Sequence, residues 1–231
     1  MRLIFVASDR MEFRGIAAKA EQKQKANIGV DWAVSARLGG NEVLFVANGV
    51  GWKRASEALD RAQAIFPADA IVSTGFCGAL DPELEIGDAV VATYVVGPQG
   101  RYPAIPLSDA HGVARGIVIS TDHVVGSAME KRGLREQGGS VVEMEAAAVA
   151  MGAQALGLPF SCARAVTDLA TEDMANDFGA VLRPDGHFDT IGLIRHMLRR
   201  PGVRLPELVR LRQNCTRAAR NLGEFFADCR F

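Results

Sequence analysis

Short runs of β-branched and other apolar residues alternate with helical patterns along the chain, and this alternation constrains the fold most strongly. The runs at residues 3–7, 70–74 and 160–166 have the length and composition of buried strands. Between them, residues 56–66 carry apolar side chains at helical spacing. Strands separated by helices predict a mostly parallel sheet covered on both faces. We therefore expect an α/β fold, a three-layer sandwich in which helices flank a central mixed, mostly parallel sheet.

Further elements are predicted by the same patterns, and Gly39-Gly40-Asn41 marks a hairpin turn that adds an antiparallel portion. No internal repeat or linker divides the chain, which predicts a single domain over residues 1–231. The additional expected strands are 30–38, 42–47, 88–96, 117–121 and 141–145, and the additional helices are 11–25, 127–137 and 145–156, followed by two C-terminal helices.

The composition excludes several classes of protein. Hydrophobic residues make up 48% of the chain and the formal net charge is −1, which argues against a disordered chain and against a nucleic-acid binder. No apolar run reaches the ~18 residues of a membrane span, and the apolar stretch at the start is too short for a signal peptide. We therefore expect a cytoplasmic protein. The four cysteines are far apart, which predicts free thiols and no metal site.

The C-terminal tail differs in charge from the rest of the chain. Residues 193–231 contain nine arginines and three acids, so they carry +6 while the remainder carries −7. Apolar residues recur at helical spacing over residues 205–226. Two interpretations remain open: a packing helix with a solvated basic face, or an amphipathic helix that touches anionic membrane surfaces or acidic partners.

Two glycine-containing loops follow predicted strands, where open α/β sheets bind their ligands. Residues 48–53 resemble half of a dinucleotide-binding fingerprint, but Arg54 stands at the third glycine. In residues 73–80, Gly75 permits close approach of a ligand to the backbone and Phe76 could stack on a flat base. A tight turn with a core phenylalanine explains this second loop equally well.

Two acidic motifs are the strongest candidates for chemistry. Glu143 and Glu145 are two residues apart, so both carboxylates would share one face of a strand and could bind ribose hydroxyls. Their presence at a helix start is the alternative explanation. Asp168 ends an apolar strand, where partial burial would raise its pKa and suit it to general acid catalysis. It could instead cap the next turn.

Taken together, these motifs resemble the nucleoside phosphorylase/nucleosidase superfamily, especially the bacterial methylthioadenosine/adenosylhomocysteine nucleosidases. The resemblance covers residues 3 to about 182 and depends most on VEMEA at 142–146 and RAVTD at 164–168. It implies that Asp168 protonates the departing purine and that Glu12 positions the attacking water. The implied substrate-binding residues are Glu145 at the ribose hydroxyls, Met144 under the sugar, Glu143 near the base, Val124 and Val125 at the base edge, and Gly75 and Phe76 in the neighbouring loop.

The resemblance implies an enzyme that cleaves the N-glycosidic bond of an adenine nucleoside with a modified 5′ group. It requires no metal or organic cofactor, and it implies a homo-oligomer. A phosphorylase that uses inorganic phosphate as co-substrate and yields a pentose 1-phosphate is the alternative. Phe76 replaces a serine of relatives and the phosphate loop after the first strand is absent, but Arg10 or Arg14 could still bind phosphate. The presence of Glu12 favours water. A non-catalytic nucleoside-binding protein is the alternative of another class.

A second departure concerns the 5′ side of the sugar. Only 28 residues separate Asp88 from Ile117, so a helix found in relatives is missing and residues 98–106 form an expected irregular loop. Such a shortened cap could admit a bulky 5′ substituent. The loop at 75–80 and the basic tail also resemble the hopanoid-associated members, which implies a lipid-linked adenosine as substrate.

Overall fold

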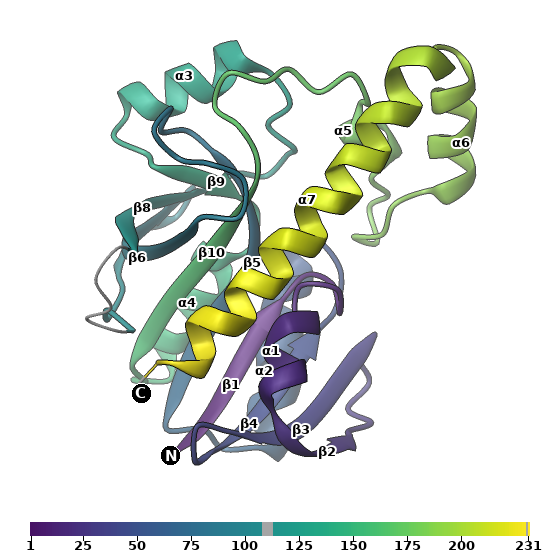
Figure 1. Cartoon of the computed structure of the whole chain (residues 1–231). Coiled ribbons are helices and arrows are strands. Elements are labelled where there is room, and N and C mark those ends of the chain that lie inside the picture. Colours follow the sequence, from purple (N-terminus) through teal and green to yellow (C-terminus); the bar gives the residue numbers. More distant parts are fainter. Residues whose placement is uncertain (108–112, 230) are drawn as a thin grey trace.

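A central mixed sheet organises the computed structural model, which describes residues 1–107, 113–229 and 231 (Figure 1). The strands follow the order β10-β6-β8-β9-β5-β1-β4-β3-β2, with β7 paired to β6. They are β1 (Arg2–Ala7), β2 (Glu21–Lys25), β3 (Trp32–Leu38), β4 (Asn41–Ala47), β5 (Ala70–Ala79), β6 (Ala89–Gly97), β7 (Gly100–Pro103), β8 (Ala114–Ser120), β9 (Val141–Glu143) and β10 (Phe160–Asp168).

The sheet closes on itself at one end. Strand β10 pairs in parallel with β5 and antiparallel with β6, while β9 joins β5 to β8. The five strands β5, β9, β8, β6 and β10 therefore form a closed ring, and β1, β4, β3 and β2 extend from it as an open sheet. The expected α/β class is confirmed. The closure is an addition that alternation of strands and helices does not indicate.

Helices cover both faces, so the sheet separates two apolar cores. One core includes residues of α2 and α4, and the other includes residues of α1 and α7. The helices are α1 (Arg14–Lys19), α2 (Trp52–Ile65), α3 (Ala128–Glu136), α4 (Ala146–Ala155), α5 (Phe178–Val181), α6 (Thr190–Leu198) and α7 (Pro201–Ala227).

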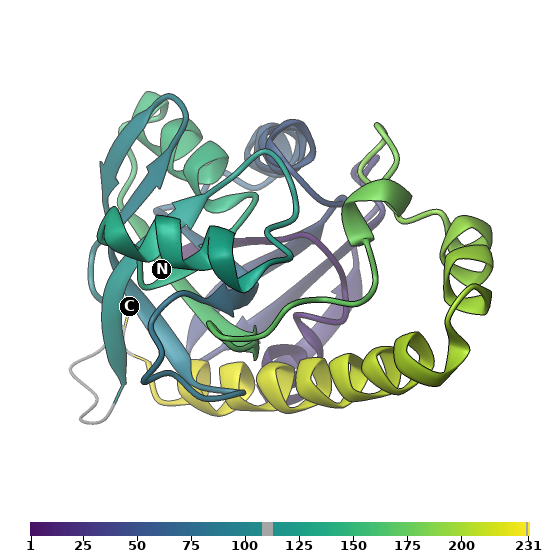
Figure 2. The ribbon, with the colours of Figure 1, turned by 90° about the horizontal axis from the view of Figure 1, so that it is seen from above.

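Two glycines allow α1 and α7 to cross in backbone contact. A Cβ added at Gly15 would lie 1.9 Å from the carbonyl oxygen of Ala219, and one added at Gly223 would lie 2.4 Å from the carbonyl carbon of Gly15. The C-terminal half of α7 is therefore part of the core, where Ala218, Leu222 and Phe226 are buried. Its N-terminal half and α6 stand out from the body (Figure 2).

The prediction of a helix over residues 11–25 is wrong. Only Arg14–Lys19 is helical, and Glu21–Lys25 forms β2, an edge strand whose residues are all exposed. The segment lacks an apolar stripe for packing a longer helix, and it pairs instead with the free edge of β3. The loop over residues 98–106 is partly regular, because Gly100–Pro103 returns as β7 against β6.

The prediction that residues 141–145 form one strand is also wrong at its end. Strand β9 stops at Glu143, and Glu145 is the N-cap of α4. The two carboxylates therefore do not share a strand face, and they serve different partners. No helix in the described part of the chain is long and apolar enough to cross a bilayer.

Candidate active site

A cavity of about 220 Å³ collects side chains from the ends of several strands. Strands β5 and β10 run in parallel, so their carboxyl ends meet at this edge. Every candidate side chain named from the sequence lines the cavity, with Gly75 adjoining it through Phe76. The lining residues that were predicted from the sequence are Glu12, Phe76, Val124, Val125, Glu143, Met144, Glu145 and Asp168.

Asp168 ends β10 and is buried. Its Oδ1 accepts a hydrogen bond from the Thr167 hydroxyl at 3.0 Å, and its Oδ2 lies 2.6 Å from Nζ of Lys131 on α3. Burial raises the pKa of the Asp168 carboxyl above its usual range, and the Lys131 ammonium opposes that rise. A carboxyl in this setting can keep a proton at higher pH than an exposed aspartate and can donate it.

Glu12 lies in the turn after β1 and is held by four donors. Its Oε2 accepts from the amide and hydroxyl of Ser8 and from the amide of Asp9, at 2.7, 2.8 and 3.0 Å. Its Oε1 accepts from the amide of Phe76, at 2.7 Å, and from no other donor among the described residues. Burial raises the pKa of Glu12, and the nearby charge of Arg164 lowers it. Oε1 is therefore the oxygen with capacity to accept a further hydrogen bond.

Gly75 leaves open the space beside that oxygen. Its φ is +139°, and a Cβ built on it would lie 2.4 Å from Oε1 of Glu12 and 2.7 Å from Nη1 of Arg164. Any larger residue would therefore fill the volume next to Oε1 of Glu12. The sequence indicated a glycine that permits close approach, and the structure identifies the carboxylate that it serves.

Both carboxylate oxygens of Glu143 already have partners within the protein. Its Oε1 accepts from the Ser120 hydroxyl, and its Oε2 accepts from the amides of Glu145 and Ala146 at 2.9 and 2.8 Å. The same Oε2 lies 2.7 Å from Nη2 of Arg164. Glu143 thus caps the start of α4 and neutralises a buried cation, although it also borders the cavity.

Arg164, in the middle of β10, is fully buried. Besides Glu143, it donates to the hydroxyl of Ser73 and to the carbonyl of Thr74, both at 2.7 Å. From the sequence, Arg164 is recognisable only as part of the motif at 164–168. An arginine inside an otherwise apolar strand is the signal that could have identified it, because such a charge requires a buried partner.

Glu145 remains available to a ligand at one oxygen. Its Oε1 accepts from the amide of Gly51 at 2.7 Å, which ties the loop after β4 to the start of α4. Burial, followed by the neighbouring charge of Glu143, raises the pKa of Glu145 to about 8. Met144 lies beside it in the same cavity wall. This geometry agrees with a carboxyl group that accepts or donates toward sugar hydroxyls.

A much larger cavity of about 690 Å³ adjoins the first and shares Glu12, Phe76 and Asp168 with it. It reaches from the sheet, where Trp32 and Ala47 line it, to residues of α5, α6 and α7. Figure 2 shows these three helices arching out from the body. Its wall is rich in apolar side chains, including Met11, Trp32, Met174, Phe178, Phe188, Leu193 and Leu211.

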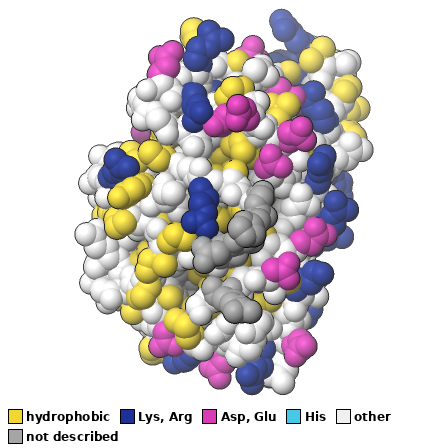
Figure 3. All heavy atoms as spheres, turned by 60° about the vertical axis from the view of Figure 1, so that its left-hand side comes forward, with side chains coloured by type: hydrophobic (Ala, Val, Ile, Leu, Met, Phe, Trp, Pro, Cys, Tyr) yellow, Lys and Arg dark blue, Asp and Glu magenta, His cyan; other side chains and the backbone are white. Residues whose placement is uncertain are grey.

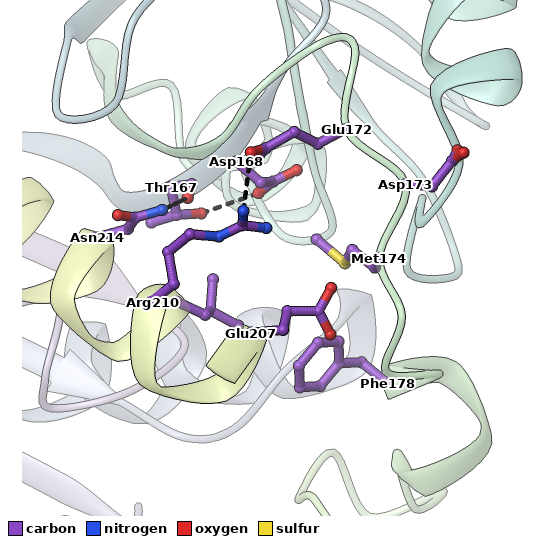
Figure 4. Close-up of a pocket in the computed structure, with 10 residues that line it drawn as sticks. Thr167, Asp168, Glu172, Asp173, Met174, Phe178, Glu207, Arg210 and Asn214 are labelled. Atoms are coloured by element: carbon purple, nitrogen blue, oxygen red, sulfur yellow. Dashed lines mark hydrogen bonds and ion pairs between the residues drawn. The ribbon is translucent and has the colours of Figure 1, made fainter. Parts of the chain in front are cut away.

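A third, water-sized cavity of about 20 Å³ lies on the α7 side of Asp168 (Figure 4). Arg210 points across it toward Glu172, with Nη1 to Oε1 at 3.6 Å. Asn214 donates to the backbone carbonyl of Thr167 at 2.9 Å and so holds the end of β10 against α7. Among the residues described, no group of three or more His, Cys, Asp or Glu side chains is arranged to hold a metal ion.

Buried carboxyl groups with raised pKa, facing one cavity at the ends of parallel strands, define an α/β enzyme of acid–base chemistry. The chain belongs to the phosphorylase superfamily, whose model matches residues 2–115 and 108–184. The resemblance found in the sequence is confirmed, as is the expectation of an enzyme that acts on N-glycosidic bonds.

Two relatives with similar sequences are nucleosidases. The 5′-methylthioadenosine/S-adenosylhomocysteine nucleosidase of Shewanella piezotolerans is 26% identical over 208 residues, which cover 77% of this chain and 90% of that protein. The enzyme of the same name from Staphylococcus saprophyticus is 29% identical over 177 residues, covering 63% and 77%.

Solved structures share the fold along nearly the whole chain. The Streptococcus pneumoniae 5′-methylthioadenosine/S-adenosylhomocysteine nucleosidase, with a transition-state inhibitor, superimposes with a TM-score of 0.74 at 18% identity, covering 98% of this chain and 99% of that one. The futalosine hydrolase of Helicobacter pylori gives 0.69 at 17% identity, with 96% of each chain covered.

Proposed function

We propose that this protein is a nucleosidase that hydrolyses the N-glycosidic bond of an adenine nucleoside carrying a bulky, apolar 5′ group. Relatives of the same family are nucleosidases named for methylthioadenosine and adenosylhomocysteine. The observation that carries the substrate assignment is the 690 Å³ apolar-walled cavity beside the acid residues. It is far larger than a 5′-methylthio group needs, and it falls within the range of pockets that enclose large organic ligands.

In this proposal Asp168 is the general acid. Its proton moves to a ring nitrogen of the purine while the C1′–N bond breaks and the bonding electrons leave with the base. Positioned general acids of this kind contribute ~10²–10⁴-fold to a rate. Glu145 binds the ribose hydroxyls through its second oxygen, and hydrogen bonds to sugar hydroxyls that strengthen in the transition state lower the barrier. The chemistry requires no metal or organic cofactor.

Water is the proposed nucleophile. It would lie in the space above Gly75 and donate a hydrogen bond to Oε1 of Glu12. The alternative, phosphate, meets an obstacle: the amides of Ser8, Asp9 and Phe76, which would suit an anion, already donate to the Glu12 carboxylate. Arg164 is likewise occupied by Glu143. These contacts support hydrolysis over phosphorolysis.

A single assay series tests this function. The protein is incubated with adenosine and with 5′-alkylthioadenosines whose chains run from methyl to octyl, with and without phosphate, and adenine and sugar products are followed. We expect phosphate-independent adenine release whose kcat/KM rises with chain length. Strict phosphate dependence with a pentose 1-phosphate product would identify a phosphorylase, and tight binding without base release would identify a nucleoside-binding protein.

A lipid-linked 5′ group would be met at a membrane surface, and the segment over residues 190–206 is suited to one. It contains four arginines and no acid, and it exposes large apolar side chains beside the wide cavity. Basic residues interleaved with apolar ones favour anionic lipid surfaces. The exposed apolar residues are Ile191, Ile194, Leu198, Val203 and Leu205.

Vesicles containing phosphatidylserine test this contact. We expect co-sedimentation of the full chain that is lost in Leu198→Glu and kept in Ile65→Glu, a matched change at an exposed apolar residue of α2. Equal partitioning of both variants would mean that the tail does not bind membrane and only packs against the rest of the protein.

The homo-oligomer stays a prediction, tested by light scattering. Apolar side chains also gather on the face that Figure 3 shows. Tyr94 on β6 and Ile105 after β7 are exposed apolar residues that offer a separate surface for a second copy.

A further inference from the structure

Lys131 is a fully buried lysine, and it is the one residue of α3 that is buried. Lysine side chains are almost never fully buried unless they are paired, because the ammonium loses its hydration. The neighbouring Arg132 and Arg135 of α3 are not buried. A single cation of this helix has therefore been directed inward, toward the end of β10.

Three oxygens receive the Lys131 ammonium. Nζ donates to Oδ2 of Asp168 at 2.6 Å, to the carbonyl of Leu169 at 2.7 Å and to the carbonyl of Glu172 at 3.5 Å. These acceptors satisfy all three protons of an ammonium group. The Asp168 side chain is the one acceptor among these three that becomes charged when it loses its proton.

The start of α3 is fixed so that Lys131 keeps this direction. Ser127 is the N-cap, and its hydroxyl accepts from the amide of Glu130. The amide of Ala128 donates to the Asp173 carboxylate at 2.7 Å, and the amide of Met174 donates to the carbonyl of Gly126 at 2.8 Å. The helix start and the segment after Asp168 thus hold each other in place.

Charged and titratable groups surround Asp168 on several sides. Burial raises the pKa of the Cys77 thiol well above its ordinary value and that of the Cys215 thiol to about 12, so neither titrates near neutral pH. On the α7 side, the guanidinium of Arg210 pairs with Glu172. On the protein side these groups are Cys77 on β5, Lys131 on α3, Glu172 and Asp173 after β10, and Glu207, Arg210 and Cys215 on α7. Across the 220 Å³ cavity, Glu12, His123, Glu143 and Glu145 share its lining with Asp168.

We propose that Lys131 is a positioning residue for the proton donor, which fixes the Asp168 carboxyl group and stabilises the carboxylate that forms when its proton leaves. The inference rests on the proposed function. As the proton passes to the purine nitrogen, the C1′–N bond breaks, water oxygen bonds to C1′ and the water proton moves to Glu12. The negative charge left on Asp168 then lies beside an ammonium ion that is already in place, so little reorganisation is needed.

This role predicts the direction in which the pKa of Asp168 changes when Lys131 is replaced. An opposite charge in contact lowers a carboxyl pKa by 1–3 units, so removing the Lys131 charge raises the pKa of Asp168. Carbon-13 NMR of protein labelled at the aspartate carboxyls follows that titration without any substrate, with Asp168→Asn assigning the signal. We expect an upward shift of about one unit or more in Lys131→Met and in Lys131→Gln. The glutamine variant keeps a hydrogen-bond donor, so it separates charge from tethering.

Activity gives the second readout. The alkaline limb of kcat/KM for an adenine nucleoside is expected to move upward with the Asp168 pKa, while kcat at neutral pH falls at least ~10-fold in both variants. With p-nitrophenyl riboside, whose leaving group departs without protonation, the loss is expected to stay below about threefold, as it should in Asp168→Asn. Circular dichroism melting checks that each variant is folded.

Two results would overturn the role of Lys131. One is an unchanged Asp168 titration in both folded variants. The other is an equal loss of rate on the nucleoside and on p-nitrophenyl riboside, which is what a general structural role that does not act through Asp168 would produce. Failure of the proposed function looks different, since the wild-type protein would then release no adenine while the NMR titration still reports on Lys131 and Asp168.

Discussion

The polar floor of the site and the arch above it are built in opposite ways. The floor, made of Glu12, Glu143, Glu145, Arg164 and Asp168, is buried, and its ionisable groups are paired or held by backbone amides. The arch, made of α5, α6 and the N-terminal half of α7, exposes apolar side chains and borders the 690 Å³ cavity. Fixed charges suit chemistry that depends on geometry, whereas an apolar wall suits substrates that vary in length.

Removing the proposed proton donor should give the largest effect on the floor. Asp168→Asn is isosteric and keeps the contact surface with Thr167, but it cannot donate a carboxyl proton. We expect kcat for an adenine nucleoside to fall by ~10²–10⁴-fold while the protein stays folded. Adenine release measures kcat, and thermal melting shows whether the variant is folded. Full activity in a folded variant would remove Asp168 from the chemistry.

Breaking the buried ion pair should damage the stability of the floor. Arg164→Met leaves the Glu143 carboxylate without its cation, and loss of one partner of a buried pair costs about 3–5 kcal/mol. Urea unfolding of Arg164→Met and of Arg164→Lys, which keeps a charge, measures the difference. Where Arg164→Met does not fold, the lysine variant alone should still be destabilised, because it cannot reach Ser73, Thr74 and Glu143 together.

The extent to which the sequence predicts these two regions also differs. Strand ends and acids of the floor follow from motif and periodicity, because a parallel strand must deliver its C-terminal residues to one edge. Lys131 does not follow, since nothing in a charged helix with Lys131, Arg132 and Arg135 tells which cation turns inward. The different partners of Glu143 and Glu145 could not be predicted either, because they depend on where β9 ends.

The arch was predicted only as two C-terminal helices with a basic excess. A local pattern such as that of residues 205–226 shows that a helix has an apolar side, but it does not show whether that side is covered. In the structure the side is covered along the half of α7 that contains Leu222 and Phe226, and Val203, Leu205 and Val209 remain exposed. Coverage depends on α1 and the sheet, which are distant in sequence.

The pH dependence of stability is a further property of the floor. Glu145 keeps its proton in the folded protein up to about pH 8, whereas its ordinary pKa is 4.5. The folded state binds more protons between these values, so the free energy of unfolding should fall as pH rises through this window. Glu12 and Asp168 have raised pKa values and act in the same direction.

Glu145→Gln isolates the contribution of that carboxyl group. We expect urea unfolding of the wild type to lose more stability between pH 5 and pH 8.5 than the glutamine variant loses, by on the order of 2 kcal/mol. The same slope in both proteins would show that Glu145 is ionised in the folded state across this range.

The smallest expected effect belongs to the arch and leaves the floor intact. Leu193 lies on α6 in the wall of the wide cavity, so Leu193→Asp places a carboxylate where an apolar 5′ chain would lie. Each buried methylene contributes about 0.8 kcal/mol, so kcat/KM for an octylthio substrate should fall by ~10-fold as one or two methylenes lose their apolar surroundings. The value for adenosine should not change, because adenosine has no chain to reach α6. Leu156→Asp, at an exposed leucine after α4, is the matched control. Equal losses on both substrates would mean that Leu193 supports the floor, and the division between a floor for chemistry and an arch for substrate length would not hold.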